Sequence, residues 1–235
     1  MHGVDVRVGP SGPESPHVRR VVGLVGGTGA LGRGLASRLS SAGHRVLIGS
    51  RDLARAEASA ESLGNDASGV TNQGACDADL VLVVVPWSGH DETLRSLQGA
   101  LQGRIVVDCV NPLGFDERGP FALSVDAGSA TQRAQQLLPG SVVVGAFHHM
   151  SAEVLASDNA LDSDVLVVGD DRDAVDGVID LVATITGLRG VYAGRLRNAG
   201  QVEALTANLI AINRRYRVQS GVRIAGLEPV SDTDH

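Results

Sequence analysis

The sequence predicts an α/β protein with a mostly parallel sheet, because short apolar runs typical of buried strands alternate with segments of helical periodicity. The first apolar run, 21–25, leads into glycines at the spacing G-x-G-x-x-G, at Gly27, Gly29 and Gly32. A strand, this glycine pattern and a helix, in that order, are the fingerprint of a Rossmann-like, doubly wound fold. Beyond it we expect a smaller C-terminal α/β extension that ends in a long helix.

Each glycine of the pattern has a physical reason. We expect Gly27 to let the chain turn sharply out of the strand, Gly29 to let a pyrophosphate approach the backbone, and Gly32 to let the helix pack closely. The following helix would direct its unpaired N–H groups and the positive end of its dipole at the phosphates. The residues expected to bind the dinucleotide here are Gly27, Thr28, Gly29, Ala30 and Leu31.

Composition excludes several classes of protein. The length of 235 residues suits one domain with an appendage. The formal charge of -7 argues against nucleic-acid binding. Cys76 and Cys109 are too few for a disulfide framework, so we expect a reducing, cytoplasmic setting. No apolar run reaches the roughly 18 residues of a membrane span. All 20 basic residues are arginine, which excludes any mechanism that needs a catalytic lysine.

The elements expected from periodicity follow in order along the chain. Residues 1–18 show no periodicity and are expected to form a disordered leader. A helix is expected over about 30–42, because its leucines recur every four residues, and Gly43 ends it. The elements expected next are strands over 45–49, 70–71, 79–85, 104–110 and 141–147, with helices over 53–63 and 129–138.

The C-terminal part is expected to complete the sheet with strands over 165–169 and 191–192 and an intervening helix. A last helix is expected over about 199–217, where apolar residues are spaced three and four apart. Such a stripe is usually core, but here it also suggests a contact between subunits, so we expect a homodimer. We place the dinucleotide-binding domain at 19–152 and a small C-terminal domain at 153–235.

The end of the second strand indicates which dinucleotide is bound. Proteins that prefer NAD commonly carry an Asp or Glu roughly 20 residues past the glycines, where it binds the ribose 2′-hydroxyl. Here Ser50 and Arg51 occupy that place, and Arg55 follows one helical turn later. A hydroxyl and guanidinium groups bind a 2′-phosphate, which a carboxylate would repel, so the sequence predicts NADP. Asp52 is expected in the first turn of the next helix, where negative charge is favourable.

The ends of later strands carry further candidates, because ligands in such sheets lie beyond the carboxyl ends of the strands. The segment 86–90 should border the nicotinamide. Its Trp87 is either a ligand contact or packing, and His90 is a site residue or, as we favour, a polar residue in the first turn of a helix. Adjacent His148 and His149 on an extended chain would point to opposite faces and could not easily share a metal ion. We expect no metal site, with one ring facing the ligand cleft and the other packing.

Seven segments recur together in one known family. In unbroken order between about 19 and 226 they are 26–32 (GGTGALG), 49–51 (GSR), 85–87 (VPW), 108–114 (DCVNPLG), 145–149 (GAFHH), 169–171 (GDD) and 202–206 (VEALT). With them the chain resembles the NADPH:coenzyme F420 oxidoreductases, also called F420-dependent NADP reductases. The resemblance implies an enzyme that exchanges hydride reversibly between NADP(H) and the deazaflavin coenzyme F420, each being the other's substrate.

The resemblance also implies roles for particular residues. The loop 28–31 would contact the pyrophosphate, and Ser50, Arg51 and Arg55 would hold the 2′-phosphate. The residues implied to line the nicotinamide and deazaflavin sites are Val85, Pro86, Asn111, Pro112, Phe147, His148, His149 and Ala152, with the F420 cleft assigned to the C-terminal domain. His90 does not fall at the same step as the histidine of some family members, which leaves its role open.

No catalytic side chain is expected, because hydride transfer between two ring systems needs positioning rather than a protein nucleophile. His148 and His149 are candidates for orienting F420. Two other functions stay open on the sequence: an NADP-dependent reductase of another small substrate, and a non-catalytic NADP-sensing protein. A Tyr-x-x-x-Lys dehydrogenase is excluded, because neither Tyr192 nor Tyr216 is followed by a lysine. The expected partners are small-molecule cofactors, with neither nucleic acid nor a membrane.

Overall fold

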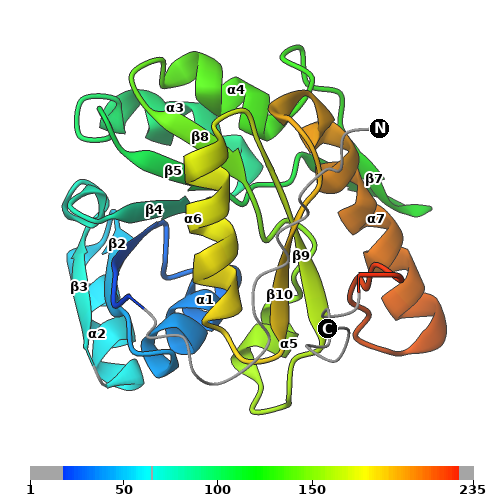
Figure 1. The fold of residues 1–235 in the computed structure, drawn as a ribbon, viewed down its shortest axis with the longest axis horizontal. Coiled ribbons are helices and arrows are strands. Elements are labelled where there is room, and N and C mark those ends of the chain that lie inside the picture. Colours follow the sequence, from blue (N-terminus) through cyan, green and yellow to red (C-terminus); the bar gives the residue numbers. More distant parts are fainter. Residues whose placement is uncertain (1–17, 65, 228–235) are drawn as a thin grey trace, which may run out of the picture.

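The computed structural model describes residues 18–64 and 66–227. Nearly all of the expected leader lies outside the described residues. The main strands are β1 (Val21–Val25), β2 (Arg45–Ser50), β3 (Ala67–Thr71), β4 (Leu80–Val83), β5 (Ile105–Asp108), β8 (Val142–Gly145), β9 (Ser163–Gly169) and β10 (Leu188–Tyr192) (Figure 1). The α-helices are α1 (Ala30–Ser41), α2 (Leu53–Leu63), α3 (Trp87–Leu97), α4 (Ala130–Leu137), α5 (Ala152–Ala156), α6 (Arg172–Ala183) and α7 (Ala199–Tyr216).

These eight strands form one sheet in the order β10-β9-β8-β5-β4-β1-β2-β3. From β3 to β8 all neighbours are parallel, and the chain changes direction across the sheet between β1 and β4, as in doubly wound folds. β8 and β9 pair antiparallel, whereas β9 and β10 are parallel. The expected mostly parallel, Rossmann-like sheet is therefore confirmed, as is the C-terminal α/β extension that ends in a long helix.

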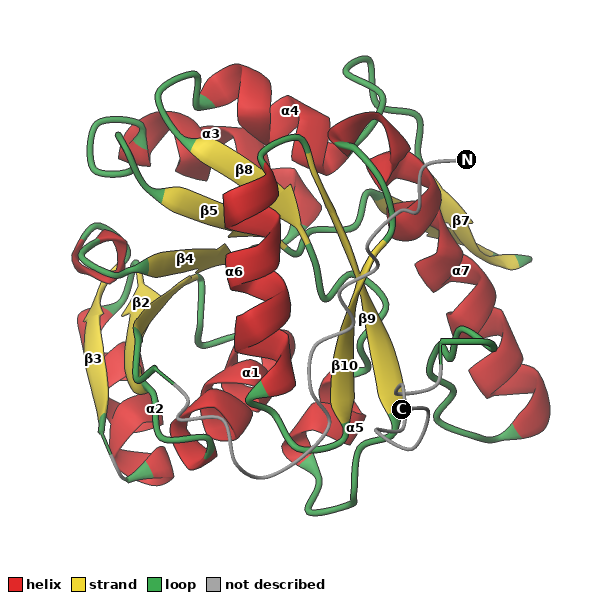
Figure 2. Ribbon diagram, viewed as in Figure 1, coloured by secondary structure: helices red, strands yellow, loops and turns green. Residues whose placement is uncertain are grey.

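Helices cover both faces of the sheet (Figure 2). In β4, Leu80 and Leu82 join the core beneath α1, α2, α5 and α6, whereas Val81 and Val83 join the core beneath α3 and α4. All four side chains are fully buried. A strand covered on both faces needs apolar residues at every position, which explains the continuous apolar run in the sequence.

Three features differ from the elements that periodicity predicts. A hairpin of β6 (Leu113–Asp116) and β7 (Gly119–Ala122) follows β5, and Asp116 stabilises its turn by accepting two backbone N–H groups, one from Gly119 at φ 120°. α5 has 5 residues, too few to show a helical period. α3 begins at Trp87, so the segment 86–90, for which only His90 was placed in a helix, is almost wholly the first turn of that helix.

α7 lies at the side of the molecule away from β3, packed against β7 and α4 (Figure 1). It ends at Arg217, whose backbone is left-handed with φ 54°. The chain then returns past the start of β9 as a segment that we call the C-terminal strap, residues 219–224. The carboxylate of Asp164 fixes this strap, because it accepts the N–H of Ile224 at 2.6 Å and pairs with Arg189 at 2.8 Å.

Strands from both sides of residue 152 share this one sheet, and the division of the chain into domains at that point stays a prediction. None of the described helices combines the length and the apolar character needed to cross a membrane.

Candidate active site

The carboxyl ends of four parallel strands lie in one row. The register pairs Val25 with Val83, Val83 with Asp108, and Asp108 with Gly145. The loops that follow these residues therefore leave the sheet side by side, at one edge. Ligands bind at this edge in open α/β sheets, and most of the predicted site residues lie in these loops.

The glycine loop connects β1 to α1. Its left-handed residue is Gly26, with φ 78°, so the sharp turn that we expected at Gly27 is made one residue earlier. Gly27 is needed for packing instead, because a Cβ there would lie 2.9 Å from the Cβ of Leu24. Gly32 permits a close approach as expected, since its Cβ would lie 2.5 Å from the carbonyl oxygen of Gly27.

The N-terminus of α1 is available for an anion. Gly29 is its N-cap and supplies no side-chain hydrogen bond to the first N–H groups of the helix. A Cβ on Gly29 would meet only the carbonyl oxygen of Gly26 within 4 Å, at 3.7 Å, so the space beside it is open. Ala30 is exposed, Leu31 half-buried and Thr28 buried. An uncapped helix end beside open space fits a pyrophosphate.

The end of β2 fits a 2′-phosphate. Arg51 and Arg55 are exposed, and neither guanidinium has a hydrogen bond or ion pair within the part of the chain that the structure describes. Asp52 is the N-cap of α2, where its side chain accepts the N–H of Arg55 at 3.2 Å. The hydroxyl of buried Ser50 accepts the N–H of Asp52 at 3.1 Å. The one carboxylate of this segment is thus engaged by the helix, as expected, and both guanidinium groups stay available.

The loops after β4 and β5 form the middle of the edge. The predicted residues here differ in exposure: Pro86 is exposed, Val85 half-buried and Pro112 buried. Asn111 joins its loop to the next strand, because its Nδ2 donates to the carbonyl oxygen of His148 at 2.6 Å. The hydroxyl of Thr206 in α7 donates to the same oxygen at 2.9 Å. The ends of β5 and β8 and the helix α7 therefore meet at one carbonyl group.

Both histidines after β8 are buried, and the chain turns here rather than continuing in the extended form that we expected. Which ring faces the ligand cleft stays a prediction. Phe147 adopts φ 62°, so the chain turns here, and its side chain is fully buried. His148 and His149 are only 2% and 4% exposed, and Nε2 of His149 accepts the N–H of Leu166 at 3.2 Å. Burial lowers the pKa of both rings, that of His149 to about 4. Both imidazoles are therefore neutral at pH 7.

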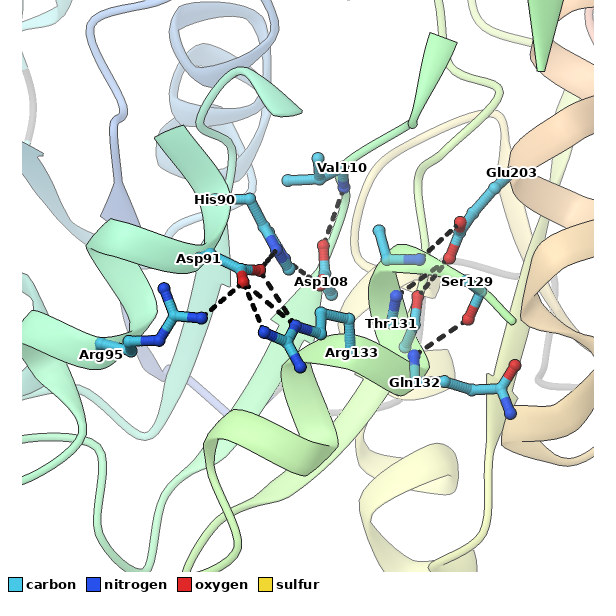
Figure 3. Close-up of polar contacts among 11 residues, drawn as sticks. His90, Asp91, Arg95, Asp108, Val110, Ser129, Thr131, Gln132, Arg133 and Glu203 are labelled. Carbon is cyan, nitrogen blue, oxygen red and sulfur yellow. Dashed lines mark hydrogen bonds and ion pairs between the residues drawn. The ribbon is translucent and has the colours of Figure 1, made fainter. Parts of the chain in front are cut away.

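A buried network next to His148 was missed by sequence reasoning (Figure 3). The carboxylate of Glu203 in α7 accepts the N–H groups of Ala130 and Thr131 at the start of α4, at 2.9 and 3.0 Å, and the Thr131 hydroxyl at 2.8 Å. Because this bond uses the only hydroxyl proton, Thr131 can only accept from Nε2 of His148, 3.5 Å away. A carboxylate beside the apolar stripe of α7 was the only signal, and it does not distinguish a buried residue from an exposed one.

His90 is buried as well. It lies in the first turn of α3, as expected, but its side chain is fully buried, and its Nε2 lies 2.8 Å from Oδ2 of Asp108 at the end of β5. The rings of Trp87 and His90 have centroids 5.3 Å apart. Trp87 also lines a cavity of about 440 Å³ together with Asp91 and Arg133. The place of His90 in the first helical turn is as expected, and the choice between a ligand contact and packing for Trp87 stays a prediction.

A cavity of about 610 Å³ lies between the turn after β8, the start of α5 and α7. Its wall includes His149, Ala152, Thr206, Arg214, Arg217 and Gln219. Gln219 of the C-terminal strap crosses to α5, where it hydrogen-bonds to Ser151 and Glu153. Arg214 and Arg217 pair with no acid among the described residues. The cavity therefore adjoins the strand edge and carries two cations without an acidic partner.

The cysteines offer no reactive group. Cys76 and Cys109 are free and buried, and burial raises the pKa of both thiols, that of Cys76 to about 11. Within the described ranges, no group of three or more His, Cys, Asp or Glu side chains is placed to hold a metal ion.

A glycine loop at the N-terminus of a helix, with free guanidinium groups at the end of the next strand, defines a Rossmann-type dinucleotide-binding protein that prefers NADP. The family described as "NADP oxidoreductase coenzyme F420-dependent" matches residues 21–112. The F420-dependent NADP reductase of Methanothermobacter thermautotrophicus is 36% identical over 220 residues, which cover 88% of this chain and 95% of the relative. That of Methanocaldococcus jannaschii is 34% identical over 88% of this chain and 99% of its own. The chain therefore belongs to the family of F420-dependent NADP oxidoreductases, as the resemblance predicted.

Solved structures show the same fold. A protein from Arthrobacter sp. FB24, assigned as a candidate F420-dependent NADP reductase, superposes with a TM-score of 0.76 at 24% identity, over 88% of this chain and 99% of that one. A hypothetical protein from Sinorhizobium meliloti gives a TM-score of 0.64 at 27% identity, over 77% of this chain and 86% of that one. The roles of individual site residues stay predictions.

Proposed function

We propose that the protein catalyses reversible hydride transfer between NADP(H) and the deazaflavin coenzyme F420, so that NADPH is oxidised as F420 is reduced. The observation that carries this proposal is the layout of the strand edge. On one side lies a dinucleotide cradle with two free guanidinium groups, and on the other a cavity of about 610 Å³. Two ligands can therefore meet at the ends of β4, β5 and β8. The relatives named above are F420-dependent NADP reductases.

The NADP site is assigned to the N-terminal part of the chain, 19–152. The glycine loop, 27–31, binds the pyrophosphate, and Ser50, Arg51 and Arg55 bind the 2′-phosphate. The residues assigned to the nicotinamide cleft are Val85, Asn111 and Ala152. Those assigned to the deazaflavin beside it are Pro86, Asn111, Pro112, Phe147, His148 and His149, of which buried Phe147 contributes through its backbone. The C-terminal part, 153–235, supplies the second side of the cleft.

The chemistry of the transfer resides in the two substrates, since bound NADPH supplies the hydride and the deazaflavin accepts it. The chain contributes position and the exclusion of water. Asn111 and Thr206 fix the backbone at the centre of the edge through the His148 carbonyl. His148 and His149 are uncharged at pH 7, because burial lowers their pKa. They therefore orient the site rather than act as acids.

The proposal is tested by mixing the purified protein with NADPH and oxidised F420 and following the loss of the visible absorbance of the deazaflavin, with NADH in a parallel cuvette. We expect rapid bleaching with NADPH and little with NADH. NADPH binding without bleaching would contradict the proposal. In that case, reduction of an imine by NADPH or oxidation of a β-hydroxy acid by NADP+ would indicate another oxidoreductase, and no turnover at all would indicate an NADP-sensing protein.

The cavity is assigned to F420. The side chain of this coenzyme carries a phosphodiester and glutamate carboxylates, whereas its tail-less deazaflavin precursor carries no charge there. Arg214 and Arg217 line the cavity and are free to pair with such anions. The double substitution Arg214→Ala and Arg217→Ala should raise the KM for F420 while that for the tail-less precursor stays constant. An equal change for both acceptors would place the tail elsewhere.

We also assign the exposed apolar residues of β6, β7 and α7 to contact with a second copy of the chain. Phe115 and Tyr216 are 66% and 69% exposed, and Phe121 and Ile212 are 43% and 39% exposed. β7 and α7 pack together, so these side chains belong to neighbouring elements. Light scattering should give the mass of a homodimer, and Phe115→Glu with Tyr216→Glu should give a monomer. A wild-type monomer at micromolar concentration would contradict this assignment.

The compartment proposed for the protein is the cytoplasm. Both thiols are free and buried, and NADPH and reduced F420 are reductants of that compartment. Cell fractionation should recover the reductase activity with soluble cytoplasmic enzymes, and recovery outside the cytoplasmic membrane would contradict the placement.

A further inference from the structure

His90 lies between two carboxylates, buried Asp108 and half-buried Asp91 (Figure 3). Its Nε2 is 2.8 Å from Oδ2 of Asp108, and its Nδ1 is 3.6 Å from Oδ1 of Asp91. The side chains of His90 and Asp108 are both 0% exposed. Sequence reasoning left the role of this histidine open, and the proposed reaction makes no use of it.

Both ring nitrogens of His90 therefore face groups that can only accept hydrogen bonds. A neutral imidazole would donate from Nε2 to Asp108 and direct the lone pair of Nδ1 toward Asp91, whereas an imidazolium keeps the bond to Asp108 and is also attracted by the charge of Asp91. Nδ1 itself lies too far from Asp91 for a hydrogen bond. Burial alone would lower the pKa of His90, but the hydrogen bond to Asp108 and the charges of Asp108 and Asp91 outweigh it and raise that pKa above its ordinary value. The geometry thus favours a charged His90.

The charged groups around this ring come from several elements. On α3 itself, Arg95 donates to Oδ2 of Asp91 at 2.7 Å. Arg133 from α4 donates to the same oxygen at 2.7 Å, and its hydrogen bond is the main cause of the lowered pKa of Asp91. Asp108 comes from β5, and beyond it lies the neutral His148. Asp91 is therefore ionised and fixed in place by two arginines, next to His90.

Asp108 carries the interaction from His90 to the strand edge. Its other oxygen, Oδ1, accepts the N–H of Val110 at 2.9 Å. Val110 directly precedes Asn111, whose amide holds the carbonyl of His148. One carboxylate thus connects the interior of α3 to the loop that lies in the middle of the proposed cleft.

We propose that His90 and Asp108 are positioning residues: the charged His90 holds Asp108, and through it the Val110–Asn111 turn, in the conformation that the NADPH cleft requires. The inference rests on the proposed NADPH site. Because the pKa of His90 is raised, the interaction is complete at low pH and is lost as the pH rises through that pKa. NADPH affinity should fall over the same interval.

The charge of His90 can be measured without any ligand. Trp87 is the only tryptophan of the chain, and its ring lies 5.3 Å from that of His90 at an interplanar angle of 36°. A protonated imidazole quenches indole fluorescence more strongly than a neutral one, so the emission should rise as His90 loses its proton. His90→Gln should abolish this transition, and the control His44→Gln, at a buried histidine in the connection between α1 and β2, should keep it. A transition that persists in His90→Gln would overturn the charge assignment.

The positioning role is tested by two further measurements on the same variants. Glutamine at position 90 can donate one hydrogen bond to Asp108 and does not titrate, whereas alanine cannot donate. The affinity of the wild type for NADPH should fall about tenfold across the pH range of the Trp87 transition. His90→Gln should bind NADPH with an affinity that does not change over that range. His90→Ala should bind NADPH about tenfold more weakly than the wild type at low pH, and equally weakly across the range. Amide exchange at Val110 should be slow in the wild type and in His90→Gln, and faster in His90→Ala.

These outcomes separate the inference from the proposed function. If His90→Ala binds NADPH as tightly as the wild type and its Val110 amide exchanges as slowly, the positioning role is overturned, even if F420 is reduced normally. Failure of the wild type to bind NADPH would overturn the proposed function, while the Trp87 and Val110 measurements would still decide whether a charged His90 holds the turn.

Discussion

At the scale of single residues, we expect two arginines to decide which nicotinamide cofactor is bound. Replacing Arg51 or Arg55 by alanine should weaken NADPH binding about 10- to 100-fold, because each lost charge-assisted hydrogen bond is worth about 1.5–3 kcal/mol. NADH lacks the 2′-phosphate, so its affinity should stay constant. The measurement is the Kd of each cofactor by fluorescence titration. Arg45→Ala is a matched control, because Arg45 is exposed at the opposite end of β2, and equal weakening of NADPH and NADH would show that the phosphate lies elsewhere.

The sequence predicts this segment well because its geometry is local. Asp52 caps α2 through a residue three positions on, so the order of residues alone indicates that it is engaged. His148 and His149 are different, because their orientation follows from the left-handed backbone of Phe147 and from β9 and α4. The contacts with β9 and α4 each join residues 17 positions apart in the sequence, and no short pattern encodes them.

At the scale of elements, the contact of α1 with its glycine loop depends on the absence of one methyl group. Gly32→Ala would place a Cβ 2.5 Å from the Gly27 carbonyl oxygen, so the helix must move away from the loop. We expect a loss of about 2–4 kcal/mol in the free energy of unfolding and weaker binding of NADPH and NADH alike. Chemical denaturation and fluorescence titration measure the two effects.

Gly89 supplies the matched control for that substitution. It also lies in a helix, α3, but a Cβ there would meet nothing within 4 Å. Gly89→Ala should therefore stabilise the protein by up to about 1 kcal/mol, because alanine is the better helix former. If both variants lose the same stability, steric contact with the loop does not explain the need for Gly32.

Glu203 connects α7 to the start of α4 through three hydrogen bonds. Glu203→Ala leaves two buried N–H groups and a hydroxyl without this acceptor, so we expect a loss of about 3 kcal/mol in the free energy of unfolding. Glu203→Gln keeps the size and one acceptor oxygen and should lose less. Urea denaturation measures both, and an alanine variant as stable as the wild type would contradict the role of Glu203.

The order and type of the main elements could be predicted because buried parallel strands and amphipathic helices carry strong periodic signals. Elements without a period were missed, as the hairpin of β6 and β7 and the short helix α5 show. The antiparallel pairing of β8 with β9 was missed too, because a continuous apolar run such as 165–169 indicates burial and not direction.

At the scale of the whole molecule, the attachment of the C-terminal strap through Asp164 makes the stability of the folded protein depend on pH. Arg189, together with the Ile224 N–H and Arg223, outweighs burial and lowers the pKa of Asp164. The contribution of the ionised Asp164 to the free energy of unfolding is therefore present above the ordinary pKa of an aspartate. It is lost as the pH falls through the lowered pKa of Asp164. The melting temperature of Asp164→Asn should be lower than that of the wild type at pH 7, and the difference should shrink in acid. Calorimetry at several pH values checks this.

Limited digestion provides a local readout of the same prediction. Trypsin cleaves after arginine; Arg217 precedes the strap and Arg223 lies in it. Because Asp164→Asn loosens the strap, trypsin should cut this variant there faster than it cuts the wild type. Unchanged cleavage rates together with an unchanged melting temperature would show that Asp164 does not hold the strap.

The meeting of β5, β8 and α7 at the His148 carbonyl bears on how this protein could evolve. The proposed donor site is encoded by the first part of the chain, and the wall of the acceptor cavity largely by the last helix and the strap. Mutations at Leu209, Ile210 or Asn213 therefore change the shape of the cavity without altering a residue of the donor site. A new hydride acceptor could be selected through α7 alone. The specificity for the hydride donor and that for the acceptor can therefore evolve, or be engineered, one at a time.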